Sequence, residues 1–90
     1  MNYKRIYNQL IEKRRLHPAK LGNEYTENHH VIPRSIDKTL EFDKNNLVSL
    51  TAREHFIAHL LLVMIYREFK SDDYYKMLYA FNYMQLSFRK

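Results

Sequence analysis

A regular spacing of apolar residues marks a helix near the start of the chain. Apolar side chains fall on one helical face at five positions: Tyr3, Ile6, Tyr7, Leu10 and Ile11. Polar and charged residues fill the positions between them, so an amphipathic helix is predicted over residues 2–16. His17-Pro18 ends this helix, because the residue before a proline is disfavoured in helical conformation. A connection over residues 18–24 follows.

Two short strands are predicted after this connection. Residues 25–32 contain Tyr, Thr, Val and Ile and end at Pro33, a composition typical of a β-strand. Residues 46–50 form the second strand. Residues 34–45 lie between them, and they are mostly polar and charged. They are predicted to form a long loop with three apolar anchors: Ile36, Leu40 and Phe42.

Two long helices are predicted for the rest of the chain. Thr51 is followed three residues later by Glu54, which is the capping-box pattern that starts a helix. This helix is expected to extend to about Phe69. Ser71-Asp72-Asp73 gives a second start signal, because acidic side chains are stabilised near the positive N-terminus of a helix. The last helix is predicted over residues 72–88.

The last two helices carry most of the large apolar side chains. Those of the middle helix cover nearly all of its sides, which predicts burial between neighbours: Ile57, Leu60, Leu61, Leu62, Val63, Met64 and Ile65. Those of the last helix recur at helical spacing: Tyr74, Met77, Leu78, Phe81 and Met84. Core packing explains this stripe better than base stacking does. The amount of apolar surface also leaves open a homodimer, in which these helices form an oligomerisation unit.

Length and composition restrict the class of protein. Ninety residues allow one domain with a core near the lower size limit for stability, and a bound metal ion would add folding free energy. The absence of cysteine excludes disulfides and thiolate zinc sites. No secretory signal is recognised, and the longest apolar run, residues 57–66, is shorter than the ~20 residues of a membrane span. A soluble, cytoplasmic chain without membrane contact is therefore expected.

The net charge of +5 lies in the first part of the chain. Residues 1–22 carry the single acid Glu12 and six basic residues: Lys4, Arg5, Lys13, Arg14, Arg15 and Lys20. Residues 23–90 are neutral overall. A basic segment on a neutral body suggests binding to a polyanion, although a solvated helix face explains the same residues about equally well.

Histidines give the strongest chemical signal. Four of the five lie between Glu27 and His59. His55 and His59 are four residues apart on the predicted helix, so their side chains can share a metal ion. This pair alone is a weak signal, and Phe56 stands where a metalloprotease motif requires glutamate. The rings of His29 and His30 point to opposite faces of a strand, so one can join the metal and the other can serve another purpose.

Residues 24–64 resemble the HNH nuclease motif. The resemblance rests on His29-His30-Val31-Ile32-Pro33, then Asn46-Leu47-Val48, then His55 and His59. The sequence from Leu50 to His59 is also similar to that of small phage-type HNH endonucleases. Many relatives carry a glycine-rich loop after Arg34, whereas Asp37–Asn45 contains no glycine, which leaves the shape of this hairpin open.

The resemblance implies an α+β fold and a set of roles. The fold is a ββα-metal core over residues 24–69, a basic leading helix over 1–22 and a C-terminal helix over 70–90, all in one domain. The implied metal ligands are His29, His55 and His59. His30 is the implied general base, and Asn46 holds the loop and orients that base. The implied cofactor is one divalent ion: Mg²⁺, Mn²⁺, Ni²⁺ or Zn²⁺.

The expected activity is hydrolysis of DNA phosphodiester bonds, leaving 5′-phosphate and 3′-hydroxyl ends, by a phage-encoded enzyme in the host cell. Arg34 and Arg53 flank the motif and are candidates for phosphate contacts, although an ordinary surface position explains both arginines about equally well. Five residues of the leading helix are further candidates: Lys4, Arg5, Lys13, Arg14 and Arg15. Glu54 is explained better as the capping-box acid than as a ligand. The alternative function is a non-catalytic, metal-stabilised module that binds nucleic acid or protein.

Overall fold

Three helices and a two-stranded antiparallel sheet make up the protein in a computed structural model, which describes residues 1–18 and 25–88. In chain order the elements are α1 (Tyr3–Leu16), β1 (Glu27–His30), the short 3₁₀-helices η1 (Lys38–Leu40) and η2 (Lys44–Asn46), β2 (Leu47–Leu50), α2 (Ala52–Glu68) and α3 (Tyr74–Phe88). The predicted α+β architecture, mostly helical, is confirmed. The division predicted between residues 22 and 24 lies outside the described residues.

The helix boundaries follow local signals in the sequence. Asn2 caps α1 by accepting a hydrogen bond from the backbone N–H of Arg5 at 3.0 Å, and α1 ends just before His17 as predicted. The predicted capping box of α2 is present in full, since Thr51 and Glu54 exchange side-chain and backbone hydrogen bonds. These caps satisfy N–H groups that have no partner inside the helix.

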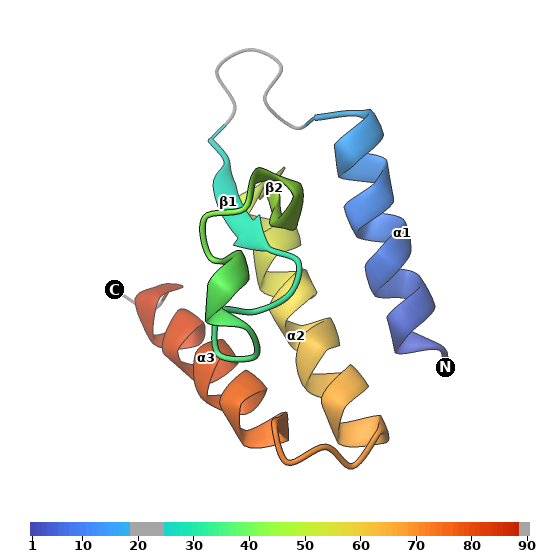
Figure 1. Cartoon of the computed structure of the whole chain (residues 1–90), viewed down its shortest axis with the longest axis vertical. Coiled ribbons are helices and arrows are strands. Elements are labelled where there is room, and N and C mark those ends of the chain that lie inside the picture. Colours follow the sequence, from blue (N-terminus) through green and yellow to red (C-terminus); the bar gives the residue numbers. More distant parts are fainter. Residues whose placement is uncertain (19–24, 89–90) are drawn as a thin grey trace.

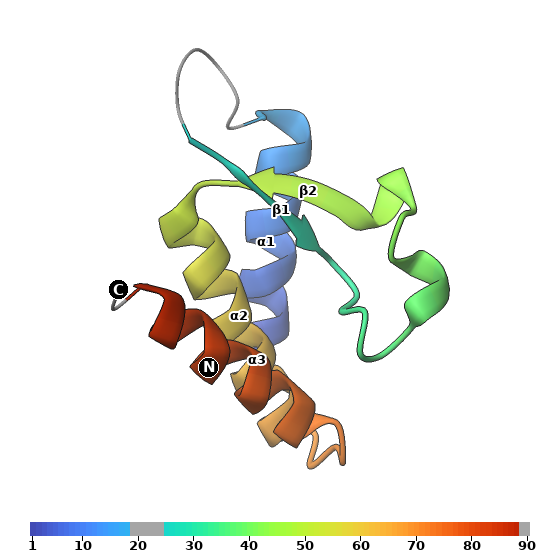
Figure 2. The same ribbon diagram turned by 90° about the vertical axis from the view of Figure 1, so that its left-hand side faces the viewer.

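Helix α2 is the centre of the fold. Both views place it between α1 and α3, with the sheet across one end (Figures 1 and 2). Among the described residues, α2 provides more of the buried core side chains than any other element: Ala58, Leu61, Leu62, Val63 and Ile65. The prediction that α2 is buried on nearly all sides is wrong at Ile57 and Leu60, which are 38% and 39% exposed. These two lie on one side of α2, along the line from Arg53 to Arg67. Because of the helical periodicity, this side faces neither α1 nor α3.

The two strands position His29 and His30 on opposite faces of the sheet. His29 pairs with Val48, and both side chains are buried. His30 pairs with Leu47, and both are only partly buried. Because side chains alternate along a strand, the buried face of the hairpin packs against the helices and carries His29 into the core. The predicted divergence of the two rings is confirmed.

The hairpin loop forms without glycine. Asp37 and Asp43 cap η1 and η2 by accepting hydrogen bonds from backbone N–H groups two residues later, which are local turns typical of aspartate. Among the non-glycine residues that the structure describes, only Lys70, after α2, has a positive φ, at 52°. No position in Asp37–Asn45 therefore needs the conformational freedom of glycine. The long loop predicted over residues 34–45 contains turns and two short 3₁₀-helices.

Helix α3 separates two sets of side chains. Met77 is buried, and Tyr74, Leu78 and Phe81 pack against the core, so core packing is confirmed for these members of the predicted stripe. Three tyrosines four residues apart face outward instead, with 66–75% of their surface exposed: Tyr75, Tyr79 and Tyr83.

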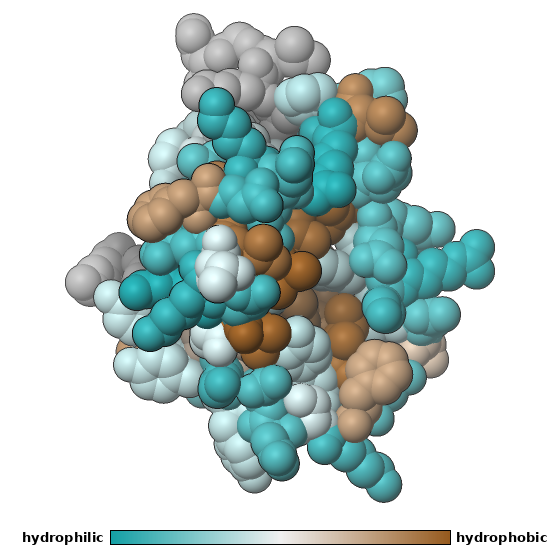
Figure 3. Space-filling model, in the orientation of Figure 1, coloured by the Kyte–Doolittle hydropathy of each residue, from teal (hydrophilic) through white to brown (hydrophobic). Residues whose placement is uncertain are grey.

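Figure 3 shows apolar side chains gathered in the middle of one face of the molecule, with hydrophilic side chains around them. No helix in the described ranges is both long enough and apolar enough to cross a membrane.

Candidate metal centre

Three histidines from two elements meet at the junction of the sheet with α2. His29 comes from β1, and His55 and His59 come from adjacent turns of α2. Their ring centroids are 4.9–5.2 Å apart. One ligand nitrogen from each lies within 4.8 Å of the others. Imidazole is a common ligand of first-row transition metals, so this geometry allows the three side chains to share one ion.

His29 is the buried member of the trio. It is 1% exposed, and its Nε2 lies 2.7 Å from the hydroxyl oxygen of Tyr7; this hydroxyl donates to the backbone oxygen of Val31 at 2.8 Å. The Nδ1 atom of His29 is buried and has no hydrogen-bond partner. A buried polar atom without a partner typically costs about 1–3 kcal/mol. A metal ion at Nδ1 would satisfy it, so the residues present fit a metal ion.

Glu27 holds the ring of His55. The Oε1 atom of Glu27 lies 2.8 Å from Nδ1 of His55, and its Oε2 accepts a hydrogen bond from the Tyr25 hydroxyl at 2.7 Å. The hydrogen bond from His55 and that from Tyr25 lower the pKa of Glu27. A carboxylate hydrogen-bonded to the outer nitrogen of a histidine is a recurring second shell of metal sites.

The environment keeps two of the trio neutral. Burial, followed by the neighbouring histidines, lowers the pKa of His29 to about 2 and that of His59 to about 4. Burial also raises the pKa of the Tyr7 phenol. A metal ligand must be the neutral imidazole, so near neutral pH these rings are in the protonation state that binding requires.

His30 lies on the other face of the strand, close enough to contribute to the lowered pKa of both His29 and His59. Its Nε2 is 3.0 Å from the backbone oxygen of Glu41. A carbonyl oxygen only accepts, so Nε2 carries the proton. In the neutral ring, Nδ1 is then the nitrogen that can accept a proton.

Asn46 clamps the two ends of the hairpin loop. Its Oδ1 accepts from the backbone N–H of Ile32 at 2.8 Å, and its Nδ2 donates to the backbone oxygens of Ile32 at 3.0 Å and Leu40 at 3.3 Å. No hydrogen bond joins Asn46 to His30. Asn46 and His30 instead contact neighbouring carbonyls of the loop, those of Leu40 and Glu41.

The candidate phosphate-contacting residues have different environments. Lys4, Arg5, Lys13 and Arg53 are exposed. Arg34 is paired with Glu41 at 3.1 Å, with its side chain 62% exposed, and Arg15 donates to the backbone oxygen of Asn45 at 2.8 Å. Arg14 is part-buried and binds both oxygens of Glu54 through Nε at 2.9 Å. Arg14 therefore joins α1 to the start of the helix that carries His55 and His59.

Replacing Arg14 with alanine is expected to destabilise the fold by about 1.5–3 kcal/mol, since hydrogen bonds to charged groups contribute that much. Burial favours a neutral Glu54, but hydrogen bonds from Arg14 and Thr51 outweigh it and lower the pKa of Glu54. The effect should therefore be present near neutral pH and shrink as pH falls through that lowered pKa. Urea unfolding measures it. Arg5→Ala, at an exposed position of α1, should change stability by less than about 0.5 kcal/mol, and equal effects of both variants would contradict the prediction.

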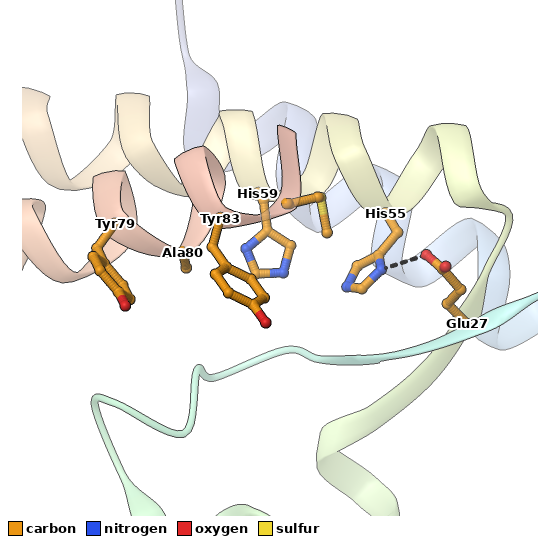
Figure 4. Close-up of a pocket in the computed structure, with 7 residues that line it drawn as sticks. Glu27, His55, His59, Tyr79, Ala80 and Tyr83 are labelled. Carbon is orange, nitrogen blue, oxygen red and sulfur yellow. Dashed lines mark hydrogen bonds and ion pairs between the residues drawn. The ribbon is translucent and has the colours of Figure 1, made fainter. Parts of the chain in front are cut away.

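A pocket of about 550 Å³ adjoins the trio. Figure 4 shows His55 and His59 beside Tyr79, Ala80 and Tyr83 of α3, with the dashed hydrogen bond leading from His55 to Glu27. The sequence did not predict that Glu27 and Tyr7 contact the histidines, or that Tyr79 and Tyr83 line the pocket. A signal existed for Glu27, because residues two apart on a strand share a face and Glu27 precedes His29 by two.

Comparisons with known proteins find relatives from Enterobacteria phage T4. "Probable mobile endonuclease B" is 56% identical over 69 residues, which cover 74% of this chain and 25% of that protein. "Probable mobile endonuclease D" is 55% identical over 69 residues, covering 73% and 26%. "Probable mobile endonuclease E" is 53% identical over 66 residues, covering 73% and 44%. No family model and no solved structure matches.

The chain thus shares more than half of its aligned residues with segments of phage proteins named as endonucleases. The match spans about a quarter of the length of two of these relatives and less than half of the third. The likeness therefore concerns a part of each relative. A shared ancestry of that part follows, because identity at this level over most of the chain does not arise by chance.

Proposed function

We propose that the chain is the catalytic part of a metal-dependent DNA endonuclease of the HNH type. The observation that carries the proposal is the meeting of three imidazoles, one of which, that of His29, has a buried Nδ1 without a hydrogen-bond partner. The names of the relatives support nuclease activity on DNA, and their phage origin supports a phage-encoded chain.

His29, His55 and His59 would hold the ion. Three protein ligands leave further coordination positions for a phosphate oxygen and water. When bound, a divalent ion stabilises the charge that develops on the scissile phosphate and on the leaving 3′ oxygen. Imidazoles favour Zn²⁺, Ni²⁺ or Co²⁺ by affinity, whereas Mg²⁺ is the abundant ion of phosphoryl chemistry, so several ions have to be compared.

His30 is proposed as the general base. With Nε2–H donating to the Glu41 carbonyl, the free Nδ1 removes a proton from the attacking water. Histidine suits this step because its ordinary pKa is close to neutral pH. Asn46 keeps the loop that carries the Glu41 carbonyl in place and so keeps the ring of His30 oriented. The products are 5′-phosphate and 3′-hydroxyl ends.

DNA would approach through exposed basic side chains of α1 and the hairpin. Lys4, Arg5 and Lys13 are exposed on α1, and Arg34 and Arg53 flank the histidines in the sequence. Contacts of this kind bind phosphates and carry little sequence information. We therefore propose salt-dependent backbone binding by this chain.

Supercoiled plasmid tests the activity. The purified chain is stripped of metal with a chelator and then supplied with Mg²⁺, Mn²⁺, Ni²⁺ or Zn²⁺ in separate reactions. At least one ion is expected to support conversion to nicked or linear DNA, and the chelator should stop it. If no ion supports cleavage, the proposed reaction is wrong. Metal-dependent melting and DNA binding without cleavage would instead favour a non-catalytic binding module.

A further inference from the structure

We infer that Tyr7 and Glu27 are positioning residues that decide which ring nitrogen two of the histidines present to the metal ion. His29 presents Nδ1, and His55 presents Nε2. The inference rests on the proposed metal site and adds two residues to it, one from α1 and one from β1. Neither is a ligand, and each acts through the histidine that it contacts.

Tyr7 fixes His29 through the direction of its hydrogen bonds. The backbone oxygen of Val31 can only accept, so the single proton of the Tyr7 hydroxyl points to it, at 2.8 Å. Only lone pairs of that hydroxyl remain for His29, whose Nε2 lies 2.7 Å away. Nε2 must therefore carry the proton of the neutral ring. Its Nδ1 then bears the lone pair, and this is the buried atom without a hydrogen-bond partner.

Glu27 fixes His55 in the opposite sense. A carboxylate only accepts, so at 2.8 Å from Oε1 the Nδ1 atom of His55 is the one that carries a proton. The lone pair of the neutral ring then lies on Nε2. Tyr25 donates to the second oxygen of Glu27 at 2.7 Å and so restrains the carboxylate. His55 and Glu27 both line the pocket beside α3, as Figure 4 shows.

The hydrogen bonds to Tyr7 and Glu27 explain how histidines on a strand and on a helix can bind the same ion. His29 and His55 approach from different elements, and a histidine offers its two nitrogens at different distances from the backbone. Because each ring is held in one tautomer, the nitrogen that binds the ion is already unprotonated before the ion arrives. His59 receives no hydrogen bond of this kind from any described residue, so it provides an internal comparison within the same site.

Nuclear magnetic resonance of the metal-free chain tests the tautomers directly. Long-range ¹H–¹⁵N correlation of the imidazoles at a pH above neutrality distinguishes a protonated from an unprotonated ring nitrogen. We expect His29 with its proton on Nε2 and His55 with its proton on Nδ1, each as one form. A proton on Nδ1 of His29 or on Nε2 of His55 would overturn the inference for that residue. DNA cleavage plays no part in this readout.

Variants then test whether Tyr7 and Glu27 are responsible. Tyr7→Phe should leave His29 as a mixture of tautomers, and Glu27→Ala should do the same for His55. Each should weaken the binding of Zn²⁺, measured by chelator competition, by about 10- to 100-fold, the usual effect of losing a second-shell partner. Glu27→Gln should restore much of the loss, because its amide oxygen still accepts from Nδ1–H.

Tyr3→Phe is the matched control, since Tyr3 lies one turn earlier on α1 and is only partly buried. It should change neither the tautomers nor the affinity. Unchanged tautomers and Zn²⁺ affinity in Tyr7→Phe would overturn the role of Tyr7, and the same result in Glu27→Ala that of Glu27. If Tyr7→Phe does not fold, the wild-type spectrum still tests the tautomers of His29 and His55, and Glu27→Ala still tests the role of Glu27. A chain with the expected tautomers that cuts no DNA would refute the proposed reaction and leave this inference standing.

Discussion

His30→Ala is expected to slow plasmid cleavage by a factor of about 10²–10⁴, the range that a positioned general base contributes. The metal affinity should stay close to that of the wild type, because His30 is outside the trio that can share the ion. The decisive measurement is the rate at which supercoiled DNA disappears with enzyme in excess over DNA. The affinity for the ion is measured separately by chelator competition.

Two further variants make the His30 prediction specific. His30→Gln keeps an N–H that can donate to the Glu41 carbonyl but provides no base, so it should be about as slow as His30→Ala. His17→Ala removes an exposed histidine at the end of α1 and should cleave at the wild-type rate. Wild-type activity in His30→Ala would exclude His30 as the base, and restored activity in His30→Gln would reduce its role to holding the loop.

Metal removal is expected to have the second large effect. At a metal concentration of 100 times Kd, an ion that binds only the folded chain adds about 2.7 kcal/mol to the free energy of unfolding. For a domain of this size, that corresponds to an increase in melting temperature of roughly 10–20 °C. The melting temperature is followed by circular dichroism, with a chelator and with each ion in turn.

His59→Ala should abolish most of this increase. It removes one of the three ligands and spares the buried contact between His29 and Tyr7, so the folded chain persists without the metal site. Cleavage should be lost together with the increase in melting temperature. The result that would refute the metal site is a wild-type melting curve that no ion shifts, or an His59→Ala variant that every ion stabilises as it does the wild type.

The helices and strands follow from signals that lie close together in the sequence. Thr51 and Glu54 are three residues apart, and His17-Pro18 is a single dipeptide, so each boundary depends on neighbouring residues alone. Strand alternation likewise places His29 and His30 on opposite faces. The turns of the hairpin were harder to predict, because Asp37 and Asp43 act through specific hydrogen bonds that a polar composition does not distinguish from an open loop.

The site is only partly accessible to such reasoning. The spacing of His55 and His59 predicts two of the ligands, and the pair His29-His30 predicts that one of its rings joins them; only the resemblance selects His29. The contacts around it are long-range: Tyr7 is 22 residues from His29, and Arg14 is 40 residues from Glu54. Apolar spacing correctly predicts that Tyr7 is buried but says nothing of its hydroxyl. The basic composition of α1 suggests DNA binding for Arg14, whereas its position depends on how α1 packs against α2.

The spacing of His55 and His59 also has a consequence for the unfolded chain. Two histidines four residues apart can meet in a single transient helical turn, whereas His29 joins them only when the hairpin packs against α2. The denatured ensemble retains fluctuating local structure of this kind, so it keeps a weak two-histidine site. Ions bound there stabilise the denatured state as well. The melting temperature will consequently rise with metal concentration at first and then level off as both states become occupied.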